Sequence, residues 1–109
     1  MAQLFYEQAL TDQPEEATNY IAASQLHVAQ AQFDEAFAIL TFGLAKADDS
    51  AAIYRAISDL YILMGDPDQA LETLRDGTAE LGETTDMLVN MGDFFTSRAN
   101  FLQVEERYT

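Results

Sequence analysis

The sequence predicts an all-α fold in which antiparallel helix pairs stack into a helical-repeat solenoid. The first observation is a repeat of 34 residues: at this offset the chain aligns with itself in ten identical positions, where chance gives roughly two or three. In the first copy these positions are Ala17, Tyr20, Ala22, Ser24, Leu26, Asp34, Ala36, Leu40, Gly43 and Ala45. The second observation is that apolar or small residues recur at i, i+3, i+4 and i+7, typical of a buried helix face, twice in each repeat.

Two full repeats, residues 17–50 and 51–84, each have the pattern of a helix, a turn and a second helix. In the second repeat, Gly65 can end a helix in the left-handed conformation, and Pro67 suits the first turn of the helix that follows. Side chains that can cap free N–H groups precede the expected helices: Asp49 or Ser50, Asp66, and Thr84 or Thr85.

Glycine occupies the same position in the second helix of each full repeat. Gly43 and Gly77 lie in the middle of these helices, where glycine costs about 1 kcal/mol relative to alanine. Their repetition predicts that neighbouring helices pack closely at these two positions.

With this period and these residues the chain resembles the tetratricopeptide repeat (TPR) family, whose unit is a 34-residue helix–turn–helix. The resemblance depends on Tyr20, Ala23, Ser24, His27, Phe33, Ala36, Leu40 and Gly43, and on Tyr54, Ser58, Tyr61, Gly65, Ala70, Leu74 and Gly77. It implies a right-handed solenoid that acts as a non-enzymatic protein-interaction scaffold.

The resemblance extends into partial units on both sides. Residues 1–16, with Phe5–Leu10 and Pro14, look like the second helix of a preceding repeat. Residues 85–109 look like a truncated repeat, with a first helix around Asn90–Phe95 and a short capping helix from Phe101 to Tyr108. We therefore expect one domain of about six to seven helices.

Composition excludes several classes of function. The chain has 19 acidic residues against five Lys and Arg, for a formal net charge of −14, and no Cys. Such a charge repels phosphate backbones and anionic membranes, and without Cys there is no disulfide or thiolate zinc site. With 49% apolar residues the chain can still bury a core, so we expect a soluble folded domain. No compartment follows, although the cytoplasm is slightly favoured.

No catalytic constellation is recognisable. The single histidine, His27, lies on a stripe expected to pack against the partner helix. Most pairs of adjacent acids fall at helix starts, where capping and the helix dipole favour them. Phosphate-binding glycine loops and nucleophile motifs do not occur. We expect no enzymatic activity, no cofactor and no metal.

The resemblance implies a concave groove, lined by the first helix of each repeat, in which a peptide or a helix of a partner lies. Carried over residue by residue, the family's inward positions are Ile21, Gln25, Val28, Ala29, Arg55, Asp59, Ile62, Leu63, Asp86, Asn90, Asp93 and Ser97. The candidate binding residues are eight of these: Ile21, Gln25, Val28, Arg55, Asp59, Ile62, Asn90 and Asp93. We expect a groove that is apolar at one end and acidic at the other, with Arg55 as its only cation.

This groove predicts a partner segment with apolar anchors and some Lys or Arg. TPR domains that hold the acidic tails of heat-shock chaperones use a clamp of Lys, Arg and Asn, and the matching positions here are Ile21, Gln25, Ala56, Asp86 and Asn90. Only Asn90 keeps a clamp-type residue, and Asp86 would repel a carboxylate. An adaptor for such tails is therefore disfavoured.

Alternatives stay open. The chain has the size and charge of the small acidic TPR-like chaperones of type III secretion systems, which cradle a helix of their client. It also suits an architectural segment of a longer array with no ligand of its own, in which case the groove side chains are simply solvated. Self-association is a further expectation, through the apolar side chains near the C-terminus: Phe94, Phe95, Phe101, Leu102 and Tyr108.

Overall fold

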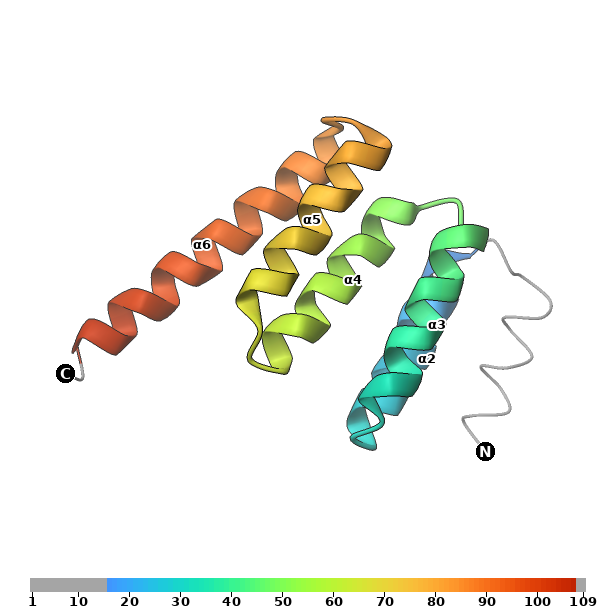
Figure 1. Cartoon of the computed structure of the whole chain (residues 1–109), viewed down its shortest axis with the longest axis horizontal. Helices are drawn as coiled ribbons and strands as arrows, with labels where there is room; N and C mark the ends of the chain where they lie inside the picture. The colour runs from blue at the N-terminus through green and yellow to red at the C-terminus, as the bar shows by residue number, and fades with distance from the viewer. Residues whose placement is uncertain (1–15, 108–109) are drawn as a thin grey trace.

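The computed structural model describes residues 16–107 of the chain, and the side chains of residues 16–98. This part forms five helices and no strand: α2 (Ala17–Ala29), α3 (Phe33–Lys46), α4 (Ser50–Leu63), α5 (Pro67–Leu81) and α6 (Thr85–Arg107), labelled as in Figure 1. The expected all-α fold is confirmed for these residues. The helix expected within residues 1–16 lies outside the described part.

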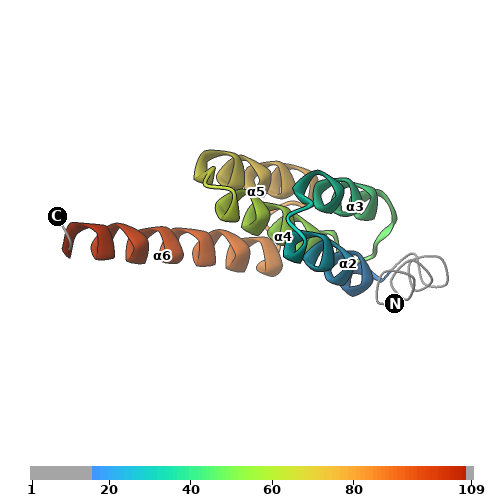
Figure 2. The ribbon, with the colours of Figure 1, turned by 90° about the horizontal axis from the view of Figure 1, so that it is seen from below.

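The helices form two layers. In Figure 2, α2, α4 and α6 lie in one layer, and α3 and α5 lie in the other. Each second-layer helix packs against the first-layer helix that precedes it and against the one that follows it. The succession of helix pairs along the chain is therefore also their succession in space, as a repeat architecture requires.

The ends of α2 and α4 are built in the same way. The N–H of Gln32 donates to the carbonyl of His27, and the N–H of Asp66 donates to that of Tyr61. This pattern needs a left-handed residue after the helix, supplied by Ala31 (φ 60°) and by Gly65 (φ 82°). The helix end predicted at Gly65 is confirmed.

Capping side chains begin the later helices as expected. Oδ1 of Asp49 accepts from the N–H of Ala52, and Oδ1 of Asp66 accepts from that of Gln69, both at 3.2 Å. Oγ1 of Thr84 accepts from the N–H of Met87 at 3.2 Å. Each of these bonds satisfies one of the N–H groups that a helix start leaves free.

One expectation about the third repeat was wrong. Instead of a first helix followed by a short helix from Phe101, α6 runs unbroken from Thr85 to Arg107. The residue that corresponds to Ala31 and Gly65 is Ala99, and α6 continues through it. Pro67 and Asp68, in the first turn of α5, are replaced here by Phe101 and Leu102, so the chain lacks both a glycine to end the helix and the proline and acid that favour a new first turn.

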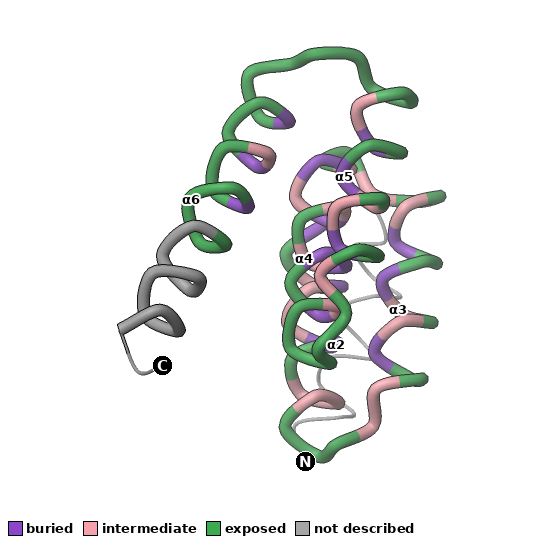
Figure 3. The backbone as a smooth tube through the Cα atoms, turned by 60° about the vertical axis from the view of Figure 1, so that its left-hand side comes forward, coloured by how far each residue is buried: buried purple, intermediate pink, exposed green. Residues whose placement is uncertain are grey.

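The core consists of two hydrophobic clusters that meet at α4. The first joins α2, α3 and α4 around Tyr20, Leu40 and Ile53, and the second joins α4, α5 and α6 around Leu74 and Met87. All five side chains are at most 1% exposed. Figure 3 shows that the buried residues of α6 are confined to the side that faces α4 and α5.

Gly43 and Gly77 lie where three helices meet. A Cβ atom on Gly43 would lie 2.9 Å from Cγ of Tyr20 and 3.0 Å from Cδ1 of Ile53. A Cβ atom on Gly77 would lie 2.8 Å from Cγ of Tyr54 and 2.8 Å from Cε of Met87. These approaches are too short for a methyl group, so the close packing predicted from the repeated glycine is confirmed.

Replacing Gly43 with alanine tests this packing. Gly43→Ala should lower the free energy of unfolding by up to about 2 kcal/mol, because overpacking costs about 1–3 kcal/mol and the gain in helix propensity returns only about 1 kcal/mol. Gly92→Ala in α6 is the matched control: a Cβ atom there meets nothing within 4 Å, so the same change should stabilise the fold. Urea unfolding at low micromolar protein concentration measures both. Equal stabilisation by the two substitutions would contradict the close approach.

The left-handed residues give a second prediction. Ala31→Gly should raise the free energy of unfolding, because an L-residue at this φ loses roughly 1–2 kcal/mol that glycine does not, and only part of that gain is lost to the more flexible unfolded chain. Gly65→Ala should lower it by about 1 kcal/mol through backbone strain alone, since a Cβ atom there meets nothing within 4 Å. Thermal unfolding of the two variants should therefore shift in opposite directions, and shifts of one sign would refute the assignment of both turns.

Candidate functional site

A hollow with a volume of about 380 Å³ lies between α2 and α4. Its walls are mainly apolar, and its floor reaches the buried side chain of Leu40 on α3. Its lining residues are Ile21, Ser24, Gln25, Val28, Leu40, Ala52, Arg55, Ala56, Asp59, Leu60 and Leu63. A hollow of this size matches the cavities in which proteins hold small ligands or the side chains of a bound segment.

Two further recesses continue the hollow between α4 and α6. One, of about 40 Å³, is lined by residues that include Arg55, Asp59, Ile62, Asn90 and Asp93. The other, of about 270 Å³, lies toward the start of both helices and also reaches Arg55 and Asn90, with Asp49 and Asp86 in its wall. Arg55 lines all three spaces, and we refer to them together as the groove across α2, α4 and α6.

The structure brings the eight candidate residues together along this groove. Those from α2 and the middle of α4 line the large hollow: Ile21, Gln25, Val28, Arg55 and Asp59. Those from the end of α4 and from α6 line the small recess: Ile62, Asn90 and Asp93. The lining is mainly apolar between α2 and α4, and it includes Asp49 and Asp86 toward the start of α6. Arg98 lines a further recess together with Ile62 and Ser97, so Arg55 is not the only cation beside the groove.

Arg55 connects the two sides of the groove. Its Nη1 donates to Oδ2 of Asp93 on α6 at 2.6 Å, and its Nε lies 3.9 Å from Oδ2 of Asp59 on the next turn of α4. All three side chains are roughly half exposed to solvent. Exposed ion pairs contribute only about 0.2–1 kcal/mol, so this one orients Arg55 more than it stabilises the fold.

The carboxyl group of Asp59 has a raised pKa. Partial burial between the groove walls raises the pKa of its carboxyl group above 3.8, and the nearby charge of Asp93 raises it further, while Arg55 acts in the opposite direction. The side chain is still 65% exposed, so the effect on stability is small. Because the folded-state pKa lies above the unfolded value, the contribution of Asp59 to stability falls as pH rises through the folded-state pKa.

Asn90 has a structural role that its assignment to the binding site did not anticipate. Its side chain is buried, and its Nδ2 donates to the carbonyl of Ala51 at 3.1 Å, which joins α6 to the first turn of α4. Its amide N–H group therefore faces α4. Asn90 lines the groove, but the donor that a carboxylate clamp would use is already bound.

Sequence reasoning missed the depth of the hollow. Leu40 belongs to a second-layer helix and is not among the expected groove positions, yet it lines the floor. The signal was present in the small residues that face each other across the hollow, Ser24 on α2 and Ala52 and Ala56 on α4. Such short side chains cannot fill the space between the helices, so the hollow extends down to the core.

The remaining candidate groups have local roles. Nδ1 of the half-buried His27 lies 2.7 Å from Oε1 of Gln32, in the turn after α2. Within residues 16–98 no three His, Asp or Glu side chains are placed to hold a metal ion. None of the described helices combines the length and the apolarity that crossing a membrane requires.

Comparison with known proteins identifies the family. A family model described as tetratricopeptide repeat matches residues 27–87, more than half of the chain, so the chain belongs to the tetratricopeptide repeat family. Repeats of this family generally mediate protein–protein interactions, and its members are typically non-enzymatic scaffolds. No curated protein and no solved structure matches the chain.

The charges around Asp59 give a testable titration. Arg55→Gln should raise the pKa of Asp59 further, because it removes the only one of these influences that lowers it. Asp93→Asn should lower the pKa of Asp59, because it removes a neighbouring negative charge and frees Arg55. The ¹³C chemical shift of the Asp59 carboxyl group, followed by NMR against pH, measures both. A wild-type midpoint at or below 3.8 would show that the groove does not desolvate this side chain.

Proposed function

We propose that this chain binds a segment of a partner protein, as a peptide or a helix, in the groove lined by α2, α4 and α6. The observation that carries the proposal is the apolar hollow of about 380 Å³ between α2 and α4, which is open to solvent and shares Arg55 and Asp59 with a charged recess. Apolar space beside a few fixed charges is the arrangement by which grooves anchor a segment and set its register.

The apolar end of the groove supplies the binding energy in this proposal. Leu63 lines the hollow while 62% exposed, and its neighbour Ile62 is 43% exposed. Burying apolar surface is worth about 25 cal/mol per Å², so one or two large apolar side chains of a partner gain most by contact with these residues and with Val28. Residues of the partner spaced like the exposed residues of one helix face fit this end.

The charged end sets the preference for a partner. Asp59 and Asp93 both pair with Arg55, and the recess beyond them adds Asp49 and Asp86. The groove is therefore net negative and favours Lys or Arg in the partner over a carboxylate. This balance also argues against recognition of an acidic C-terminal tail.

A dedicated chaperone for one client would use the same groove and is a narrower form of this proposal. An architectural segment of a longer repeat array is the second candidate. The observation that favours it is the exposure of Leu88 and Phe95 on α6, a first-layer helix that no second-layer helix follows among α2–α6.

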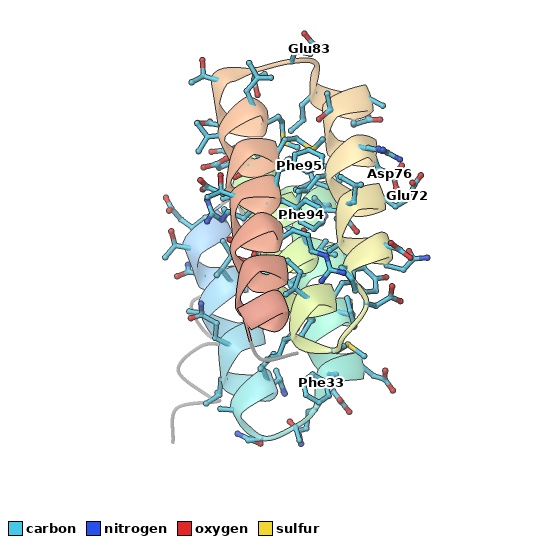
Figure 4. The ribbon with its side chains drawn as sticks, turned by 90° about the vertical axis from the view of Figure 1, so that its left-hand side faces the viewer. Phe33, Glu72, Asp76, Glu83, Phe94 and Phe95 are labelled. Carbon is cyan, nitrogen blue, oxygen red and sulfur yellow. The ribbon has the colours of Figure 1, made fainter. Side chains whose placement is uncertain are left out.

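Selection of peptides tests the proposal. A displayed random-peptide library selected on the purified chain should yield peptides with two or more apolar residues and at least one Lys or Arg. Asp59→Lys should weaken their binding by about tenfold or more, which corresponds to about 1.4 kcal/mol. Glu72→Lys is the matched control, because it changes the net charge by the same amount on α5, outside the groove (Figure 4).

A second pair of variants tests the apolar end. Leu63→Glu should abolish binding of the same peptides, whereas Phe42→Glu, an equally exposed apolar residue on α3 outside the groove, should leave it within about twofold. Fluorescence anisotropy with labelled peptides measures the dissociation constants. The groove would be refuted as the binding site if the selected peptides bound Asp59→Lys and Leu63→Glu as tightly as the controls Glu72→Lys and Phe42→Glu. A selection that yields no peptides would refute it as well.

A further inference from the structure

Asp59 lies where the apolar part of the groove meets its charged part. It lines the hollow between α2 and α4, and it also lines the small recess between α4 and α6. Arg55 is the other charged residue of the hollow, and its Nε lies 3.9 Å from Oδ2 of Asp59, too far for a hydrogen bond. Arg55 therefore leaves the acceptor capacity of this half-exposed carboxylate unused.

Arg55 is held on the α6 side instead. Its Nη1 donates to Oδ2 of Asp93 at 2.6 Å, a short charge-assisted hydrogen bond. Asp93 lines the small recess but not the hollow. The guanidinium end of Arg55 is therefore directed from α4 towards α6, and only its Nε side remains near Asp59.

The two acids compete for Arg55. Arg55 and Asp59 are four residues apart on α4, so their side chains share a helix face and can pair without any contribution from α6. Their order is the less favourable one, since an acid four residues before a basic residue pairs better than an acid four residues after it. In the absence of Asp93, Arg55 would pair with Asp59 and neutralise the carboxylate at the edge of the hollow.

We propose that Asp59 is the residue of the groove that binds a Lys or Arg of the partner, and that Asp93 positions Arg55 so that Asp59 stays available. This inference rests on the proposed function and divides the roles within it. The hollow binds the apolar side chain of the partner, and Asp59 binds its cation. Asp93 acts on that cation only through Arg55.

The hollow and Asp59 together define the chemistry of the bound group. A cavity of about 150 Å³ holds a benzene ring, so the hollow of about 380 Å³ has room for an aromatic or branched aliphatic side chain. Because Asp59 belongs to the lining of the hollow, the cation must lie close to the apolar group. In a helical partner this places Lys or Arg three or four residues from the apolar anchor, on the same face.

A pair of small probes tests this arrangement without a partner protein. Phenethylammonium joins an aromatic ring to a cation, and phenethyl alcohol has a similar shape without the charge. At neutral pH and about 150 mM NaCl, ¹H–¹⁵N NMR titration of the wild-type chain should give dissociation constants of about 1–10 mM. The ammonium probe should bind about fivefold more tightly than the alcohol, which is the most that a half-exposed ion pair contributes. The shift changes should centre on Ala52 and Ala56 in the hollow.

Substitutions of the two acids separate their roles. Asp59→Asn should remove the preference for the ammonium probe and leave binding of the alcohol within about twofold. Asp93→Asn should remove the same preference, although Asp93 does not line the hollow. Arg55→Gln in the Asp93→Asn background should restore it, because residue 55 can then no longer neutralise Asp59.

Asp86→Asn is the matched control for the loss of one negative charge. Asp86 also lies on α6 and lines a recess together with Arg55, but the ion pairs of Arg55 are with Asp59 and Asp93. It lies about 10 Å before Asp93 along the helix axis, and physiological salt screens charges beyond about 8 Å. The preference should therefore fall by less than about twofold. The ¹H–¹⁵N spectrum of each variant verifies that its fold is retained.

The inference would be overturned if the wild-type chain bound both probes alike or bound neither. It would also be overturned if Asp93→Asn kept the preference, if Asp86→Asn lost as much of it, or if the double variant did not regain it. A failed peptide selection beside the expected probe results would refute the proposed function and retain Asp59 as the cation site. Selected peptides whose binding depends on Leu63 but not on Asp59 or Asp93 would do the reverse.

Discussion

The arrangement of the helices depends on the contacts of two glycines with the side chains around them. Gly43 lies against Tyr20 of α2 and Ile53 of α4, and Gly77 lies against Tyr54 of α4 and Met87 of α6. Each glycine therefore sets two distances at once, that between the helices of its own pair and that to the next first-layer helix. The groove is the space between the first-layer helices α2, α4 and α6. Its width therefore depends on the contacts that Gly43 and Gly77 make with these helices from the second layer.

Much of this architecture could be predicted from the sequence because its signals are local and repeated. The left-handed turn at Gly65 and the caps at Asp49 and Thr84 are short-range features, and the structure confirms them. The groove residues could also be placed, since a 34-residue offset carries a position on one helix to the same face of the next.

What escaped prediction depends on the relation between helices. Ala31 adopts a left-handed conformation while its counterpart Ala99 stays helical, so residue type alone does not decide where a helix ends. Leu40 lines the groove only because short side chains lie above it, and Asn90 is bound by a carbonyl of α4 that no periodicity indicates. Each of these outcomes depends on contacts with a neighbouring helix, and such contacts cannot be derived from the local pattern of one sequence.

The position of α4 has a consequence for how the molecule responds to a ligand. This helix contributes to both hydrophobic clusters and to every part of the groove, so it cannot unfold without dissolving both clusters. A segment bound across the groove would contact α4 on its solvent side, while the two clusters contact it from within. Amide hydrogen exchange would then slow in all of the stacked helices and not only in the residues that contact the segment. Binding in the groove would therefore reduce the flexibility of the outermost described helices, α2 and α6, as well as that of α4.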